Sequence, residues 1–216
     1  MTALHDDAVR VLTGWPAAND EQERLRSAYL AHLHAHDDGL LRSCVPAHLT
    51  ASAMVLDHTG ERVLLTLHRK GNFWGQLGGH CEPGDGSLAA AALREATEES
   101  GIDGLRVVGD GPVDLHRHAL SAAFGTCGEH LDVRYAVVAP PGAEPVVSDE
   151  SHDVAWFPAD RLPPEAVDDL SRLVDRARAA LRSDQASKGS EPSDAASSAG
   201  SSSESPSPAV ADTPSR

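Results

Sequence analysis

Three glutamates, Glu95, Glu98 and Glu99, recur at helical spacing within the alanine-rich segment 87–100. At 100° per residue, positions i, i+3 and i+4 lie on one face of a helix, so these carboxylates are predicted to share a surface. Like-charged neighbours of this kind cost about a few tenths of a kcal/mol per pair. A hard divalent cation such as Mg²⁺, which binds carboxylates, water and phosphate oxygens, would offset that repulsion. The segment therefore predicts a helix whose acidic face is either solvated or a metal site.

The residues around this helix carry a longer pattern. Gly79 is followed after five residues by Asp85, and the run 94–102 reads Arg-Glu-Ala-Thr-Glu-Glu-Ser-Gly-Ile. This arrangement resembles the Nudix box, G-x5-E-x7-R-E-U-x-E-E-x-G-U, where U is an aliphatic residue. Two departures lie in its first half: the acidic residue is aspartate, and the spacer 86–93 is one residue longer than the pattern. We therefore expect Asp85→Asn to reduce activity much less than loss of a helix glutamate.

The resemblance extends over roughly residues 48–182. It implies an α+β fold, a Nudix-type α/β/α sandwich with a mixed β-sheet. It also implies divalent-metal-dependent hydrolysis of a diphosphate bond in a nucleoside diphosphate linked to another moiety: a nucleotide sugar, ADP-ribose, a dinucleotide or a (d)NTP. By the same resemblance Glu95, Glu98 and Glu99 hold Mg²⁺ or Mn²⁺ with a backbone carbonyl near Gly79, and Arg94 orients the glutamates by salt bridging.

Further carboxylates and cations are candidates for the same site. The resemblance implies an additional metal-binding or proton-accepting carboxylate in the loop before Trp156, which makes Glu150, with Asp149 as its competitor, a catalytic candidate beside Glu98, Glu99 and Arg94.

Histidines supply the remaining candidates. His130 and Arg134 lie on the polar side of an alternating strand, where they either contact substrate phosphate or form the wet face of a sheet. His116 and His118 share a strand face and can approach the same pocket. The triplet His32, His34, His36 is interpreted as a solvent-facing cluster, because only the first and last share a helical face. Cys81 beside His80 is not expected to be a nucleophilic pair, because adjacent residues on an extended segment point to opposite sides.

These groups must be positioned by regular elements. The expected strands are 49–56, 62–68, 113–123, 131–139 and 153–157, and the expected helices are 20–35, 87–100 and 164–181. A capping box, Asp20 with Glu23, begins the first helix, a turn at 57–60 closes a hairpin, and Pro164 lies in the first turn of the last helix. We expect an N-terminal helical extension (1–45), a Nudix domain (46–183) and a disordered Ser/Ala/Pro-rich acidic tail (184–216).

Composition limits the classes of partner. The chain has 216 residues and a formal net charge of -15, which disfavours general binding to the nucleic-acid backbone. Its three cysteines have no CxxC spacing and predict neither disulfides nor a zinc site of their own. No apolar run is long enough to cross a bilayer, so we expect a soluble, cytoplasmic monomer or homodimer that binds a small phosphorylated substrate.

Two alternatives stay open. One is a catalytically silent Nudix-like module that binds a nucleotide and regulates a partner. The other is an isoprenoid diphosphate isomerase, which shares this fold but requires a catalytic cysteine motif that the sequence lacks.

Overall fold

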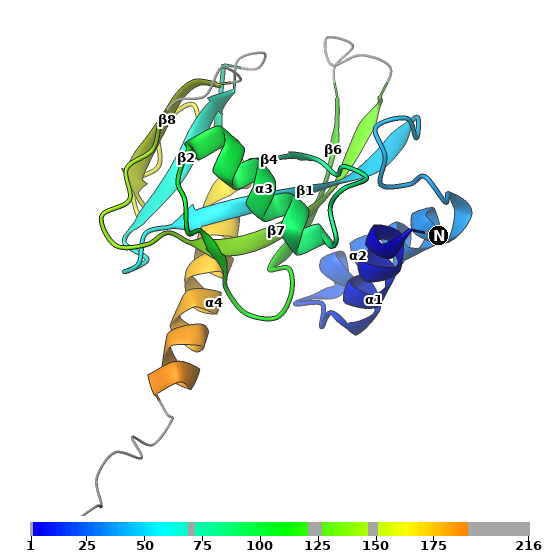
Figure 1. Ribbon diagram of the computed structural model, residues 1–216, viewed down its shortest axis with the longest axis horizontal. Helices are drawn as coiled ribbons and strands as arrows, with labels where there is room; N and C mark the ends of the chain where they lie inside the picture. Colours follow the sequence, from blue (N-terminus) through cyan, green and yellow to red (C-terminus); the bar gives the residue numbers. More distant parts are fainter. Residues whose placement is uncertain (1, 69–71, 121–126, 147–150, 190–216) are drawn as a thin grey trace, which may run out of the picture.

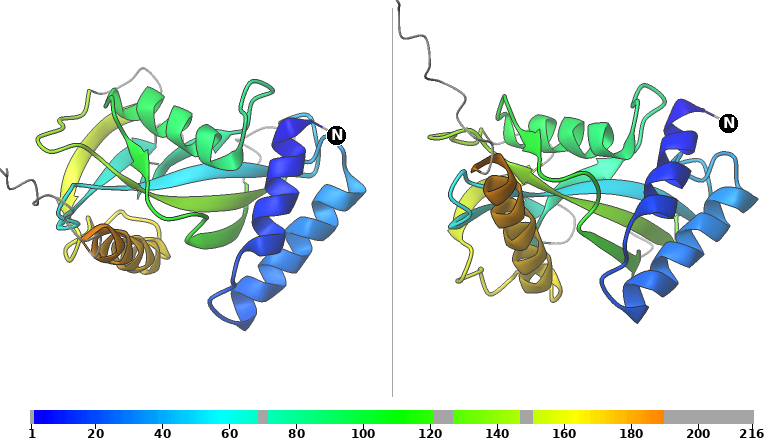
Figure 2. Two further views of the ribbon diagram at one scale, coloured as in Figure 1. Left: turned by 60° about the horizontal axis from the view of Figure 1, so that its bottom comes forward. Right: turned by 90° about the horizontal axis from the view of Figure 1, so that it is seen from below.

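The computed structural model describes residues 2–68, 72–120, 127–146 and 151–189. Eight strands form one mixed sheet between two helical layers, with α3 on one face and α4 on the other, while α1 and α2 lie at one end of the sheet (Figures 1 and 2). The helices are α1 (Ala3–Gly14), α2 (Asp20–Ala35), α3 (Leu88–Ser100) and α4 (Leu170–Gly189). The strands are β1 (Ala47–Leu56), β2 (Arg62–His68), β3 (Trp74–Gly75), β4 (Leu77–His80), β5 (Arg106–Val107), β6 (Asp114–Ala119), β7 (Glu129–Val138) and β8 (Ser151–Pro158). The expected α/β/α sandwich with a mixed sheet is confirmed.

The long strand β1 lies at the centre of the sheet. It pairs in parallel with β7 and antiparallel with β2 and β4. Successive side chains alternate between the two faces, so Ala51 and Ala53 pack toward α3, whereas Met54 and Leu56 pack toward α4. The small alanines allow α3 to lie close to the sheet, which brings its acidic face near the neighbouring strand β4. Among the described helices, none is long and apolar enough to cross a membrane.

The N-terminal extension is integrated into the main core. Leu12 on α1 and Tyr29 and Leu33 on α2 are fully or almost fully buried in the cluster that also contains Leu88 of α3 and Leu49 of β1. The helix α2 was expected, but its cap is Asn19 rather than Asp20, since the Asn19 side chain accepts a hydrogen bond from the backbone N–H of residue 22. The helix α1 was not expected.

The last helix begins and ends at later residues than the predicted range 164–181. Residues 164–169 are not helical, because the segment pairs with β3 instead: the Trp74 N–H donates to the Glu165 carbonyl (3.0 Å) and the Val167 N–H donates to the Trp74 carbonyl (3.1 Å). The helix α4 begins at Leu170 and continues to Gly189, so residues 184–189 of the expected tail are helical. The rest of that tail, 190–216, lies outside the described residues.

The other expected elements hold with small shifts. The hairpin of β1 and β2 is confirmed, and its turn is closed by the Gly60 N–H donating to the Asp57 carbonyl (3.0 Å). The strand expected over 113–123 is described only as β6, because residues 121–126 lie outside the described part. The short strands β3, β4 and β5, of two to four residues, were not expected. Periodicity gives little signal over so few residues.

The edge of β6 is covered by one side chain of α2. The Gln22 amide donates to the Leu115 carbonyl (2.9 Å) and accepts from the Leu115 N–H (2.8 Å), so it pairs with the strand as a neighbouring strand would. Gln22 is fully buried. The contact therefore satisfies two main-chain groups and fixes α2 to the sheet.

This contact yields a stability prediction. Gln22→Leu leaves both Leu115 backbone groups buried without a partner, so we expect the free energy of unfolding to fall by about 2–4 kcal/mol. Urea unfolding followed by circular dichroism measures it. The matched control is Gln185→Leu, whose exposed amide donates only to the His58 carbonyl, with an expected change within about 0.5 kcal/mol. Equal changes in the two variants would contradict the assignment.

Candidate active site

Both ends of the helix α3 are fixed by specific contacts. At the N-terminus, the Ser87 hydroxyl accepts from the Ala90 N–H (3.1 Å), and the Asp7 carboxylate of α1 accepts from the Leu88 N–H (2.9 Å). A negative charge at this end also interacts favourably with the helix dipole. At the C-terminus, Gly101 has a φ of 64°, which favours glycine, and its N–H donates to the Thr97 carbonyl (2.8 Å). The N-terminal extension, through Asp7, thus helps to position the acidic helix α3.

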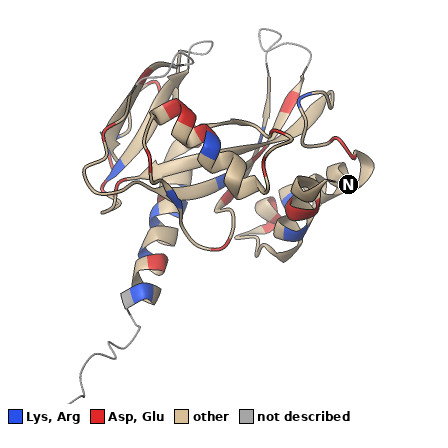
Figure 3. Ribbon diagram, viewed as in Figure 1, with Lys and Arg blue, Asp and Glu red and all other residues tan. Residues whose placement is uncertain are grey.

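The guanidinium of Arg94 gathers the acidic groups of the box. Its Nε and Nη2 donate to the two Asp85 oxygens (3.0 and 3.1 Å), and Nη2 also donates to the His80 carbonyl (2.9 Å). Its Nη1 donates to Glu95 (3.1 Å) and Glu98 (3.0 Å). All five N–H groups of an arginine are matched by these contacts. Figure 3 shows the basic residue of α3 beside the acidic residues of the same helix.

Asp85 has a defined position in spite of the longer loop. Its N–H donates to the Glu82 carbonyl (3.0 Å), and its Oδ2 accepts from the Glu82 N–H (2.7 Å). Gly84 and Gly86 have open space beside them, so the extra residue is taken up in a turn while the carboxylate still reaches Arg94. Burial acts to raise the pKa of Asp85, but the hydrogen bonds from Arg94 and from the Glu82 N–H lower it below its usual range. The spacing had not predicted this positioning role.

The glutamates of α3 lie against the main chain of β4. A Cβ on Gly79 would lie 2.7 Å from an oxygen of Glu95, so any other residue here would displace that carboxylate from its present position. The Gly78 N–H donates to Oε2 of Glu99 (3.0 Å). Glu98 is the most exposed of the three, with 59% of its side chain accessible. The structure therefore brings together Glu95, Glu98, Glu99, Arg94 and Gly79, as the sequence predicted.

The donor set suits a hard divalent cation. Carboxylate and carbonyl oxygens are the ligands that Mg²⁺ and Mn²⁺ prefer. The glycine at position 79 leaves the main chain open beside the Glu95 carboxylate, where a side chain would fill the space. The residues present thus fit the metal that the sequence pattern implied.

Arg134 lies in the interior rather than at an open phosphate site. Only 2% of it is exposed. Its guanidinium contacts Asp132 (3.0 Å), Asp114 (3.4 Å) and Asp169, and donates to Nδ1 of His116 (2.8 Å). These carboxylates occupy the donors that a phosphate would need. Of the two alternatives for Arg134, the contacts show neither a phosphate site nor a solvated face but a buried ion-pair cluster.

His130 lies on the same strand, among other histidines. Its ring centroid is 5.0 Å from that of His48 and 5.2 Å from that of His80. Burial lowers the pKa of His130 to about 3 and the pKa of His80 to about 4, so both are neutral at pH 7. Burial also raises the pKa of the Cys81 thiol to about 12, which agrees with the interpretation that it is no nucleophile. No substrate contact of His130 follows from these distances alone.

Other candidates fall outside this group. Glu150 and its competitor Asp149 lie outside the described residues. His32 and His36 share a face of α2, with ring centroids 4.8 Å apart, and His34 is exposed. Sequence reasoning missed Asp7, because the helix that carries it was not recognised.

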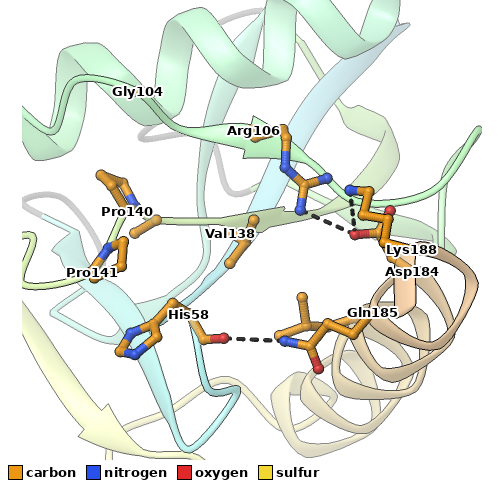
Figure 4. Close-up of a pocket in the computed structure, with 11 residues that line it drawn as sticks. His58, Gly104, Arg106, Val138, Pro140, Pro141, Asp184, Gln185 and Lys188 are labelled. Atoms are coloured by element: carbon orange, nitrogen blue, oxygen red, sulfur yellow. Dashed lines mark hydrogen bonds and ion pairs between the residues drawn. The ribbon is translucent and has the colours of Figure 1, made fainter. Parts of the chain in front are cut away.

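A surface hollow lies away from the box, between the end of β7 and α4 (Figure 4). Its two cations, Arg106 and Lys188, both contact the carboxylate of Asp184, at 3.0 and 2.8 Å. The Gln185 amide donates to the His58 carbonyl (3.2 Å). With its cations already paired, this hollow does not rival the α3 carboxylates as a site for phosphate chemistry.

Comparisons with known proteins identify the family and agree with the fold. The NUDIX domain model matches residues 46–177. The fold resembles a Nudix-family hydrolase from Clostridium perfringens (TM-score 0.50, 21% identity, 62% of this chain and 96% of that one). It also resembles an Ap4A hydrolase from C. elegans (TM-score 0.51, 18% identity, 62% and 98%) and the dihydroneopterin triphosphate pyrophosphohydrolase of E. coli (0.50, 16%, 59% and 92%). Among the curated proteins none matches significantly.

The family match covers more than half of the chain, and it contains the whole box. The chain belongs to the Nudix family. It is an enzyme of the Nudix pyrophosphohydrolase class.

Asp85 provides a prediction about stability and pH. Asp85→Asn removes the charge from the two hydrogen bonds to Arg94, so we expect the free energy of unfolding to fall by about 1–3 kcal/mol at pH 7. Because the folded pKa of Asp85 lies below its ordinary value of 3.8, its contribution is complete above that value and is lost as pH falls through the folded pKa. The deficit of the variant should therefore be constant from pH 5 to pH 7 and shrink below about pH 4.

Chemical denaturation at a series of pH values measures this deficit. The control is Glu82→Gln in the same loop, whose side chain is exposed; we expect no pH-dependent difference from the wild type. A deficit for Asp85→Asn that grows on acidification would contradict the ion pair.

Proposed function

We propose that the protein hydrolyses a diphosphate bond in a small nucleoside diphosphate derivative, using Mg²⁺ or Mn²⁺ held by Glu95, Glu98 and Glu99 with a backbone carbonyl near Gly79. One observation carries the proposal: Glu95 and Glu99 lie against the main chain of β4, and Arg94 holds Glu95 together with the exposed Glu98. When bound, a divalent cation neutralises diphosphate charge and lowers the pKa of a water molecule.

The residues of the chain itself orient the carboxylates and accept a proton. Arg94 orients Glu95 and Glu98, while the Gly78 N–H holds Glu99. Glu98 is the most exposed member of the set and is the carboxylate best placed to accept a proton from an attacking water. Glu150 is the second candidate for that role.

The class of substrate is open within this proposal. The similar folds include an Ap4A hydrolase and a dihydroneopterin triphosphate pyrophosphohydrolase, whose names specify different phosphorylated compounds. A net charge of -15 opposes binding of the nucleic-acid backbone, so we propose a free small molecule as substrate. A cytoplasmic location is a separate part of the proposal. A panel of nucleotide sugars, ADP-ribose, dinucleotides and (d)NTPs, with phosphate detection, identifies it. A panel without turnover at any substrate would favour the nucleotide-binding module instead.

Removal of metal tests the proposed cofactor. We expect EDTA to abolish turnover of the best panel substrate and Mg²⁺ or Mn²⁺ to restore it, because the carboxylates repel a diphosphate unless a cation lies between them. Initial rates before and after readdition measure the effect. Turnover that persists in chelated buffer would refute the metal-dependent mechanism.

Substitution of the helix glutamates tests their assignment. Glu98→Gln and Glu99→Gln keep nearly the same shape but remove a charge, so we expect each to lower the rate by at least about a hundredfold. The melting temperature should stay the same or rise slightly, because repulsion on α3 is relieved. The control is Glu61→Gln in the turn between β1 and β2, which should keep the wild-type rate. Near-wild-type turnover of Glu99→Gln would show that this carboxylate does not hold the metal.

A further inference from the structure

Three histidines project from the sheet face opposite α3. His48 of β1 and His130 of β7 are directly paired in the parallel register, and His80 of β4 pairs with Thr50, two residues along β1. Side chains at such positions share one face. Gly79, the neighbour of His80, faces α3 and the Glu95 carboxylate, so His80 points to the other side. The three imidazoles each place one nitrogen within 4.8 Å of the other two.

The tautomer of His48 is set by its surroundings. Its Nδ1 lies 3.2 Å from the Cys44 carbonyl and 3.4 Å from the Cys127 sulfur. We assign the proton to Nδ1, because a carbonyl can only accept and the Cys127 thiol has the carbonyls of Pro46 and Glu129 as its own acceptors. His48 is fully buried. Its other nitrogen, Nε2, nevertheless has no hydrogen-bond partner among the described residues. An unpaired buried polar atom is unfavourable, so this nitrogen calls for a partner. A free Nε2 lone pair, with Nδ1–H held by a carbonyl, is the arrangement found in metal-binding histidines.

We propose that His48, His80 and His130 form a second metal site, separate from the glutamate centre and selective for a borderline transition metal such as Zn²⁺. Neutral imidazoles suit Zn²⁺, and three of them leave a fourth tetrahedral position for water or another ligand. Tetrahedral bonds of about 2.1 Å require nitrogen separations of roughly 3.4 Å. The nitrogen atoms lie within 4.8 Å of one another, so metal binding requires the imidazoles to move closer together.

The donor chemistry separates the two centres. The α3 site offers oxygen and favours Mg²⁺, whereas nitrogen donors bind Mg²⁺ poorly. The two sites lie on opposite faces of β4, joined through His80, whose carbonyl accepts from Arg94 (2.9 Å). His118 lies next to the new site, 5.3 Å from the ring of His130, and its buried Nδ1 also has no partner within the described residues.

A rival set of donors must be distinguished. His36, Asp38 and Cys44 also place ligand atoms within 4.8 Å of one another. The first two are exposed, and solvent satisfies them without a metal. The experiment therefore includes a variant of this set.

Cobalt titration of the full-length protein tests the proposal. Metal is first removed by a chelator, and millimolar Mg²⁺ is then present throughout to occupy the carboxylates. We expect one equivalent of Co²⁺ to give the visible absorption bands of tetrahedral coordination and Zn²⁺ to displace it. His80→Gln and His130→Gln, whose side chains are only partly buried, should each weaken binding by at least about a hundredfold. His36→Ala and Glu99→Gln should bind Co²⁺ as the wild type does.

The same variants make the proposal refutable. Circular dichroism verifies that each is folded, and Zn²⁺ should raise the melting temperature of the wild type but not that of His130→Gln. Absence of tetrahedral bands in the wild type, or bands that survive both His80→Gln and His130→Gln, would overturn the site. Bands lost in His36→Ala or in Glu99→Gln would assign the metal to the rival set or to the glutamate centre, and would overturn it equally.

Discussion

One guanidinium holds the acidic box together. Arg94 contacts Asp85, Glu95, Glu98 and the His80 carbonyl. Without this cation, the carboxylates gathered at the end of β4 would repel one another and the loop before α3 would lose its fixed position. With it, Glu95 and Glu98 are oriented, but one arginine only partly neutralises the four carboxylates Asp85, Glu95, Glu98 and Glu99. The remaining negative charge would attract a divalent cation, as the proposed function requires.

The precision of this arrangement depends on elements distant in sequence. The helix α3 packs on the alanines of β1, and its first N–H groups are capped by Ser87 and by Asp7 from α1. The amide of Gln22 ties α2 to the edge of β6. The N-terminal extension thus supports the candidate active site, because it contributes both to the core and to the cap of the acidic helix.

Adjacent residues of β4 face two different groups of side chains, carboxylates on one side of the sheet and imidazoles on the other. Gly79 faces α3, where the absence of a side chain admits the Glu95 carboxylate. His80 faces the opposite side, among imidazoles from β1 and β7. The alternation of an extended strand therefore explains how oxygen donors and nitrogen donors lie close together without sharing a site.

Sequence by itself determined the family, the helix carrying Glu95, Glu98 and Glu99, and most of the strands, because these depend on local spacing and periodicity. The association of Arg94 with the glutamates also followed from the pattern. Only the tertiary structure decided that Asp85 reaches Arg94 through a longer loop, that Arg134 is enclosed by Asp132, Asp114 and Asp169, and that the segment 164–169 pairs with β3 instead of forming a helix. It also brought together His48, His80 and His130, from three strands. These outcomes rest on contacts between residues far apart in the chain, which strand register and helix packing determine and which no local pattern contains.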